Sequence, residues 1–405
     1  MWSVETACSP RLTEAEVGAG GSGPRVSIVL PTYNHGHVLP VSVASVLAQT
    51  FADFELIVVD DASTDDTGRY LLGLTDPRIR IIRHEHNRRL PSALNTGFAA
   101  ARGEFLTWTS ADNCCSPLFL EALVAALTAY PDAGLAYSAF AWIDARDRIT
   151  AVCCDQDFSY SSLLSCNPGN ASFLYRRALR DAVGVYDAEL EGTEDWDMWL
   201  RMREQCEPVY VPEILYYFRI HAGSMTATMT DAIRCAAERT FAKTLERRGE
   251  RFQLDALYPG LSLCQDQKQA GADACLDLAG KLLRSPWLNQ AMGSIAGRSL
   301  EKAVELGADR ASVDMLLALG RARCGEWEAA TQLSGQLRQR GNAEIQAIVG
   351  AMMTACARRD LDQLAGAVHA FARSHPSELA RLEQSQRRIF AFTAGQWKHG
   401  ESRDA

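Results

Sequence analysis

Short apolar segments alternate with helix-like segments along the first third of the chain, and this alternation constrains the fold more than any other feature. Strands that alternate with helices predict a parallel sheet with helices on both faces. The sequence therefore predicts an α/β domain. We expect strands at 26–30, 54–59, 79–82 and 105–108, and helices at 39–47, from about 63, at 91–102 and at 117–129. The second helix is expected to open at Ser63 because Asp66, three residues on, resembles a capping box.

The pattern becomes irregular after Tyr137 and then changes to a helical one. Strands at 139–143 and 209–211 and a helix at about 193–203 would complete the first domain. From about Asp231 the sequence is rich in Ala, Leu, Arg and Glu and has no strand-like run. We expect a flexible Gly/Ser-rich tail at 1–24, an α/β domain at 25–230 and an all-helical region at 231–405.

The helical region contains a weak internal match. Residues 316–337 and 350–371 align at an offset of 34, which pairs Ala322 with Cys356 and Ala330 with Leu364. This offset equals the period of tetratricopeptide-type helix pairs. Because only two copies are found, an unrelated helical bundle is an equally good interpretation of this region.

Charge and composition exclude several kinds of partner. A formal net charge of -9 disfavours broad electrostatic binding to nucleic acid or to anionic membranes. We expect no membrane span, because no apolar run approaches the roughly 18 residues that one requires. The twelve cysteines show no Cys-x-x-Cys spacing typical of zinc or redox sites. These features together predict a cytoplasmic protein.

Acidic residues follow two of the expected strands. Asp60 and Asp61 end the second strand, and Asp112 lies shortly after the fourth. Because ligands bind outside the carboxyl ends of parallel strands, these residues indicate a site for a nucleotide and its metal. Neither common glycine signature for nucleotide phosphates follows an early strand; the first turn is instead Pro31-Thr32-Tyr33-Asn34.

Several ordered motifs resemble family 2 glycosyltransferases. Segments similar to the donor half of that family lie at 26–34, 45–51, 53–67, 100–105 and 110–113. Residues 192–201 are similar to the acidic helix of its acceptor half, so the resemblance covers about 25–225. It implies a GT-A type fold with a mixed, mostly parallel sheet. It also implies inverting transfer of a sugar from a nucleoside diphosphate, with UDP as the expected nucleotide.

The resemblance also implies roles for particular residues. Thr32, Tyr33 and Asp61 would contact the base and ribose, whereas Asp60 has an alternative role as support for its turn. The expected nucleotide site as a whole comprises Pro31, Thr32, Tyr33, Asp61, Arg89 and Ala111. Arg89 has an alternative role as a solvated loop residue.

The expected metal is Mn²⁺ or Mg²⁺, held by Asp112 and His221. A diphosphate beside carboxylates needs a cation, because like charges about 4 Å apart repel by about 4 kcal/mol at an effective dielectric constant of 20. Ser110 and Ala111 stand where relatives often have acidic residues, so Asp112 is the remaining carboxylate of this turn. Metal binding should therefore be weak without the nucleotide. His221 is equally compatible with a structural role.

Catalysis would use one carboxylate as general base. Asp195, with Glu194 beside it, matches the acidic pair of the family and would take the proton of the acceptor hydroxyl. The alternative is that both residues only satisfy the first turn of a helix. The acceptor, whether glycan, lipid-linked or protein, has no readable code.

Two other functions remain open. A non-catalytic nucleotide-sugar-binding or scaffold protein is supported by Ala111 and opposed by the intact Glu194-Asp195 pair. A metal-dependent nucleotidyltransferase would normally show a basic, glycine-rich loop after the first strand, and 31–36 contains no Lys or Arg. In the glycosyltransferase interpretation the C-terminal helices would bind the acceptor or a partner protein, or mediate self-association.

Overall fold

The computed structural model describes residues 23–154, 157–167, 171–221, 223–224, 230–249, 254–340 and 343–374. Within them a nine-stranded mixed sheet has its strands in the order β3-β2-β1-β4-β8-β6-β9-β5, with β7 paired to β6. The first four strands are parallel to one another: β1 (Val26–Thr32), β2 (Phe54–Asp60), β3 (Ile79–Arg83) and β4 (Phe105–Trp108). The predicted α/β architecture is confirmed. β1 and β2 are buried along their whole length, as strands covered on both faces should be.

The second half of the sheet is less regular than the first. It contains β5 (Cys114–Cys115), β6 (Leu135–Ile143), β7 (Ile149–Cys153), β8 (Phe173–Arg176) and β9 (Val209–Arg219). β9 was expected to end at Val211 but continues, because a shift in register opposite β6 accommodates Pro212 and Glu213. The sequence did not predict β5, β7 or β8, because two are very short and β7 is mostly exposed.

Helices cover both faces of the sheet. Residues of α3 (Arg89–Ala100), α5 (Tyr160–Ser165) and α7 (Glu194–Arg203) share one hydrophobic cluster, and those of α1 (Leu39–Leu47) and α4 (Phe119–Ala129) share the other. Within the described residues of this half, the other helices are α2 (Thr67–Leu72) and α6 (Arg177–Val183).

The predicted start of the second helix is wrong. α2 begins at Thr67 rather than near Ser63. The φ of 67° at Ala62 turns the backbone away from helical geometry, and the Ser63 hydroxyl accepts from the backbone N–H of Asn34 instead of capping a helix. Asp65, not Ser63, bonds to the N–H of Thr67, at 3.0 Å.

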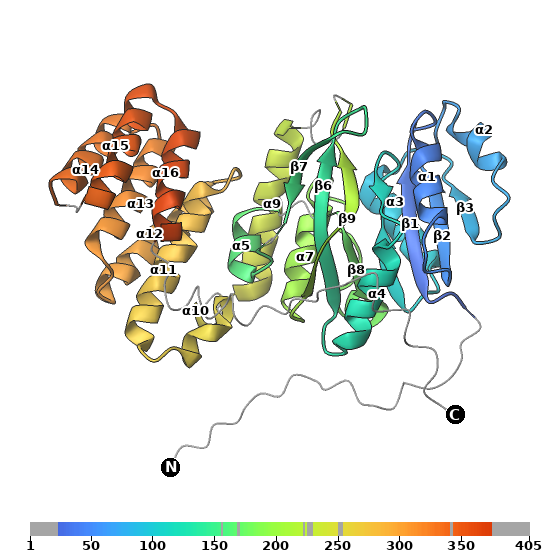
Figure 1. The fold of residues 1–405 in the computed structure, drawn as a ribbon, viewed down its shortest axis with the longest axis horizontal. Coiled ribbons are helices and arrows are strands. Elements are labelled where there is room, and N and C mark those ends of the chain that lie inside the picture. Colours follow the sequence, from blue (N-terminus) through green and yellow to red (C-terminus); the bar gives the residue numbers. More distant parts are fainter. Residues whose placement is uncertain are drawn as a thin grey trace, which may run out of the picture.

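The C-terminal region is helical, as predicted. It comprises α9 (Thr230–Arg248), α10 (Leu254–Leu257), the 3₁₀ helix η3 (Pro259–Leu263), α11 (Gln267–Arg284), α12 (Gln290–Glu305), α13 (Arg310–Arg323), α14 (Trp327–Arg340), α15 (Ala343–Arg358) and α16 (Leu361–Ser374). α11 to α16 form a stack that lies beyond α5, α7 and α9 as seen from β1 (Figure 1). The second helices of two successive pairs begin at Trp327 and Leu361, which matches the 34-residue offset. The tetratricopeptide interpretation stays a prediction.

One hydrophobic cluster is continuous from the sheet to the last described helix. It includes Val29 of β1, Trp196 of α7, Leu278 of α11 and Val368 of α16. The division at 230/231 also stays a prediction, and most of the expected tail lies outside the described residues. Among the helices described, none combines the length and apolarity that crossing a bilayer requires.

Candidate active site

The first predicted site residues lie where β1 and β2 end side by side. Pro31 and Thr32 are the last residues of β1, and Thr32 is opposite Asp60 of β2. The Thr32 hydroxyl is buried and has no hydrogen-bond partner within the described structure. Tyr33 follows with 43 % of its surface exposed. This edge therefore offers a buried hydroxyl and an exposed ring, and their contacts with base and ribose stay a prediction.

The two adjacent carboxylates at the end of β2 have different environments. Asp60 accepts from the backbone N–H of Ser63 at 2.9 Å and pairs with Arg83 at 2.5 Å. It supports the turn, which is the alternative role that the sequence left open for it. Both oxygens of Asp61 also form hydrogen bonds. One oxygen contacts the His84 ring at 2.6 Å, and the backbone N–H groups of Arg88 and Arg89 donate to the carboxylate.

Asp61 therefore holds the loop that leads into α3. A contact between its carboxylate and a nucleotide would require one of these hydrogen bonds to be released, so its role in binding stays a prediction. His84 was not identified from the sequence. It lies buried between Asp61 and Thr96, which its other ring nitrogen contacts at 3.0 Å.

Arg89 lies between the two halves of the domain. Its φ of 71° places the start of α3 in the left-handed region, where the carboxylate of Asp61 holds its N–H. Its exposed guanidinium is 3.6 Å from Glu191, three residues before Glu194. The predicted nucleotide-binding Arg89 and the predicted base are thus brought to the same side of the sheet.

The predicted metal ligands Asp112 and His221 meet across the sheet. The carboxylate of Asp112 and Nε2 of His221 are 3.0 Å apart, although 109 positions separate them in the chain. Their approach follows from the docking of β9: Arg219 donates its backbone N–H to the Asn113 side chain and its Nε to the Asp112 carbonyl, each at 2.9 Å. Ala111 beside them is buried and supplies no polar group.

His35, in the loop after β1, is a third polar residue of this region that the sequence analysis missed. Its Nδ1 is buried and makes no hydrogen bond to the residues described. Burial lowers the pKa of His35, and the nearby Asp112 carboxylate opposes this effect. Its position at the carboxyl edge of the sheet was the signal that could have identified it.

The carboxylate oxygens of Asp112 are ligands that suit Mn²⁺ or Mg²⁺. Among the residues described, no group of three or more His, Cys, Asp or Glu side chains is arranged to hold a metal. A cation held here would share its coordination with a ligand, and the His35 ring is near enough to Asp112 for that carboxylate to influence its pKa.

Glu194 and Asp195 open α7 in a buried position. The Glu194 carboxylate accepts from the N–H of Gly192 at 2.6 Å, and Oδ1 of Asp195 accepts from Asn167 at 2.9 Å and from the N–H of Trp196 at 2.7 Å. Burial, with the Asp195 charge second, raises the pKa of Glu194 to about 8. Burial also raises the pKa of Asp195, while the Asn167 hydrogen bond lowers it.

The environment of Asp195 includes further polar atoms. The Tyr186 hydroxyl is buried, and burial followed by the neighbouring Tyr175 and Asp195 raises its pKa. The Tyr175 hydroxyl and the Trp108 indole nitrogen lie near it. Asn167 and Tyr186 carry no sequence motif, so the sequence offered no signal for either.

A separate cavity of about 490 Å³ lies beside this region. Its lining includes Tyr186, Asp197, Arg201, Lys243 and Arg247, and it contains none of the predicted site residues. Ion pairs such as Asp197 with Arg201, at 2.7 Å, satisfy its charges internally. We therefore do not assign the glycosyl-transfer reaction to this cavity.

Comparison with known proteins identifies the class to which this site belongs. Residues 27–162 match the family model described as glycosyl transferase family 2. This stretch contains β1 to β4 and the Asp112 turn, and ends before Glu194 and Asp195. Residues 27–162 are thus similar to the family 2 glycosyltransferases, and the resemblance seen in the motifs of this segment is confirmed.

Individual relatives cover different parts of the chain. An uncharacterized protein y4gI of Sinorhizobium fredii is 31 % identical over 242 residues, which are 55 % of this chain but 26 % of the relative. The chain thus spans about a quarter of that protein's length. The UDP-Glc:alpha-D-GlcNAc-diphosphoundecaprenol beta-1,3-glucosyltransferase WfgD of Escherichia coli is 28 % identical over 176 residues, 43 % of this chain and 68 % of the relative.

Among solved structures, S. aureus TarS 1-349 in complex with UDP-GlcNAc aligns with 87 % of this chain and 92 % of its own. The sequence identity is 14 % and the TM-score is 0.44.

Proposed function

We propose that the protein transfers a sugar from a nucleoside diphosphate to an acceptor hydroxyl, with inversion at the sugar carbon. The observation that carries the proposal is the meeting of Asp112 and His221 at the carboxyl edge of the sheet, 3.0 Å apart. A carboxylate from the turn after β4 and an imidazole from the segment after β9 suit a diphosphate and its divalent cation. When bound, the cation supplies charge neutralisation for the departing diphosphate.

UDP is the proposed nucleotide. Support comes from the first turn, where the exposed Tyr33 ring and the unpartnered Thr32 hydroxyl can contact base and ribose. WfgD, a relative of known donor, uses UDP-Glc by its name. The Arg89 guanidinium is 3.6 Å from Glu191 and is exposed, so it could turn to contact a phosphate group of the nucleotide.

Asp195 is the proposed general base. The acceptor oxygen would form a bond to the sugar C1, the bond from C1 to the diphosphate oxygen would break, and the hydroxyl proton would pass to the Asp195 carboxylate. Oδ1 of Asp195 is fixed by Asn167 and Trp196, while the residues described leave Oδ2 without a hydrogen-bond partner. A pKa raised by burial strengthens this carboxylate as a base.

The binding part of the proposal is tested by thermal unfolding with UDP, GDP and UDP-sugars, each with and without Mn²⁺. We expect stabilisation by a UDP compound together with Mn²⁺, because ligand that binds only the folded state raises its stability. Asp112→Asn should abolish the Mn²⁺-dependent part. Asp66→Asn, an exposed change of the same kind, is the matched control. Metal-independent stabilisation that survives in Asp112→Asn would contradict the metal assignment.

The catalytic part is tested with Asp195→Asn, which keeps the shape of the side chain and removes its basicity. We expect UDP release from the stabilising UDP-sugar to fall by about 100-fold or more, with unchanged UDP binding. Near-normal turnover would remove Asp195 from the role. Stabilisation by nucleotide without turnover in the wild-type protein, with acceptors of every class supplied, would favour a non-catalytic binding protein.

A further inference from the structure

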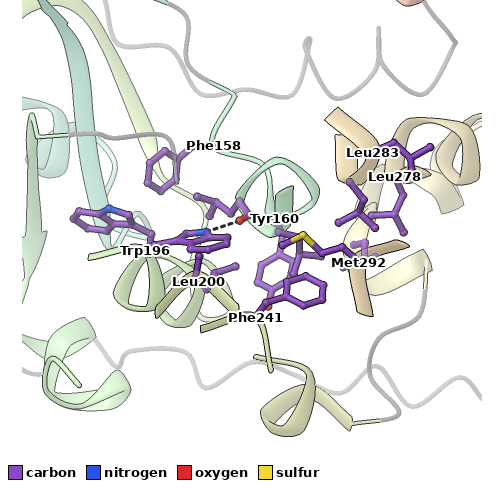
Figure 2. Close-up of a cluster of buried hydrophobic side chains, with 14 of the residues drawn as sticks. Phe158, Tyr160, Trp196, Leu200, Phe241, Leu278, Leu283 and Met292 are labelled. Carbon is purple, nitrogen blue, oxygen red and sulfur yellow. Dashed lines mark hydrogen bonds between the residues drawn. The ribbon is translucent and has the colours of Figure 1, made fainter. Parts of the chain in front are cut away.

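The short helix α5 lies between the acidic helix α7 and the C-terminal helical region. Figure 2 shows Tyr160 of α5 in one apolar cluster with Trp196 and Leu200 of α7 and with Leu278, Leu283 and Met292 of the C-terminal helices. Leu163 and Leu164 of α5 are fully buried in the same cluster. α5 is therefore packed on both sides.

On one side, α5 contacts the segment that carries the proposed base. The Trp196 indole N–H donates to the carbonyl of Leu163 at 2.6 Å, the dashed line in Figure 2. Asn167, two residues after the end of α5, donates to Oδ1 of Asp195 at 2.9 Å. Asn167 thus connects the end of α5 to the carboxylate of Asp195.

On the other side, Lys281 of α11 contacts α5 and the residue before it. The Lys281 ammonium donates to the Ser161 hydroxyl at 2.8 Å and pairs with Asp157, just before α5, at 3.3 Å. It also pairs with Asp277 of its own helix at 2.8 Å, and its side chain is 15 % exposed. Tyr258 in turn donates its hydroxyl to Asp277 at 2.6 Å.

This arrangement makes Lys281 hard to replace by an apolar residue. Its charge lies between the carboxylates of Asp157 and Asp277, which would repel each other without it. Asp157 also organises the start of α5, because its carboxylate accepts from the N–H of Ser159 at 3.0 Å and bonds to Ser162. Removal of the ammonium should therefore disturb the segment from Asp157 to Asn167.

We propose that the C-terminal helical region takes part in glycosyl transfer through α5, with Lys281 as a positioning residue that keeps Asn167 on Asp195. This role rests on the proposed function of Asp195. Lys281 acts through Ser161 and Asp157.

The test compares Lys281→Met, Lys281→Arg and Asn167→Ala in the full chain. The matched control is Lys302→Met, since Lys302 of α12 pairs with Glu305 on the surface. Hydrogen-exchange mass spectrometry measures the opening of residues 160–166. The release of UDP from the UDP-sugar that stabilises the protein in thermal unfolding gives kcat and KM, each as a function of pH. In Lys281→Met we expect faster exchange of 160–166 and a kcat lowered about as much as in Asn167→Ala, with unchanged KM.

The pH profile separates positioning from general damage. Loss of the Asn167 hydrogen bond favours the protonated form of Asp195, so the acid limb of kcat should move to higher pH in Asn167→Ala. Lys281→Met should move it in the same direction, and the double variant should be no worse than either single one. Lys281→Arg should restore much of kcat, and Lys302→Met should resemble wild type.

Two results would overturn the proposal: faster exchange with wild-type kcat, or a loss of kcat that adds to that of Asn167→Ala without moving the acid limb. Failure of the proposed function is distinguishable from both, because it appears as a wild-type protein that UDP compounds with Mn²⁺ do not stabilise. That result would remove both proposals.

Discussion

Single residues of the same type serve different purposes in this site, and their neighbours decide which. Asp60 and Asp61 are adjacent, yet Asp60 supports a turn through Ser63 and Arg83 while Asp61 holds the start of α3. Asp112 instead contacts His221 and keeps part of its surface open. Identical side chains at strand ends therefore differ in availability because of the hydrogen bonds around them.

Glu194 gives a prediction at this scale. Its folded pKa of about 8 lies above the ordinary 4.5, so the native state holds a proton that the unfolded state has released between these values. The free energy of unfolding should therefore fall as pH rises from about 4.5 to 8, by at most about 1.4 kcal/mol per pH unit. Glu194→Gln has no charge to bury and should lose this component.

Urea titrations at pH 5, 6, 7 and 8 measure the effect. The stability of Glu194→Gln relative to wild type should increase steadily across the series. Glu85→Gln, which removes the same charge at an exposed position, provides the control. A constant difference between Glu194→Gln and wild type would contradict the raised pKa.

At the scale of elements, α3 and β1 pack closely because Gly97 of α3 has no side chain at their contact. A Cβ at Gly97 of α3 would lie 2.4 Å from Cγ1 of Val29, well inside contact distance. This approach places α3, and with it Arg89, over the parallel strands.

Gly97→Ala should therefore destabilise the protein by about 1 to 3 kcal/mol, despite the better helix propensity of alanine. Gly297 of α12 is the matched control, because an added Cβ there meets nothing within 4 Å. Gly297→Ala should stabilise by up to about 1 kcal/mol. Denaturant midpoints of the two variants decide the matter; equal shifts would show that the close contact relaxes freely.

Elements were predictable wherever local pattern decides them. The strands at 54–59, 79–82 and 105–108 and the helix at 39–47 are found within about a residue, because each is a buried run or a helical stripe. The late start of α2 was not predictable, since it depends on the left-handed Ala62 and on a hydrogen bond from Asn34.

The site follows the same division. Asp112 and His221 were predictable because family motifs mark them, and the structure brings them together. His35 could have been identified from its place at the carboxyl edge of the sheet. His84 and Asn167 could not, because their carboxylate partners Asp61 and Asp195 lie 23 and 28 positions away and only the fold brings them near. Long-range contacts of this kind leave no local pattern.

At the scale of the whole molecule, one hydrophobic cluster joins the sheet to the C-terminal helices. A shared core predicts that the two parts unfold together. Leu278 of α11 is 3 % exposed in this cluster. Leu278→Ala should cost about 2 to 5 kcal/mol and should lower the stability of both parts equally.

Hydrogen exchange across a urea series checks this, with peptides from β1 and from α11 followed in the same samples. We expect one common midpoint in the wild type and one lower common midpoint in Leu278→Ala. Leu263→Ala, at a position 63 % exposed, should leave the midpoint nearly unchanged. Separate midpoints for the two peptides would show two independent folding units.

The lysine contact between α11 and α5 also limits how this chain can be recombined. A chimera that exchanges the C-terminal helices for those of another transferase would bring a foreign side chain to the position of Lys281, opposite Ser161 and Asp157. A functional chimera must therefore take residues 157–167 and α11 from the same parent protein. The junction between the two parents then lies within the α/β half rather than at its end.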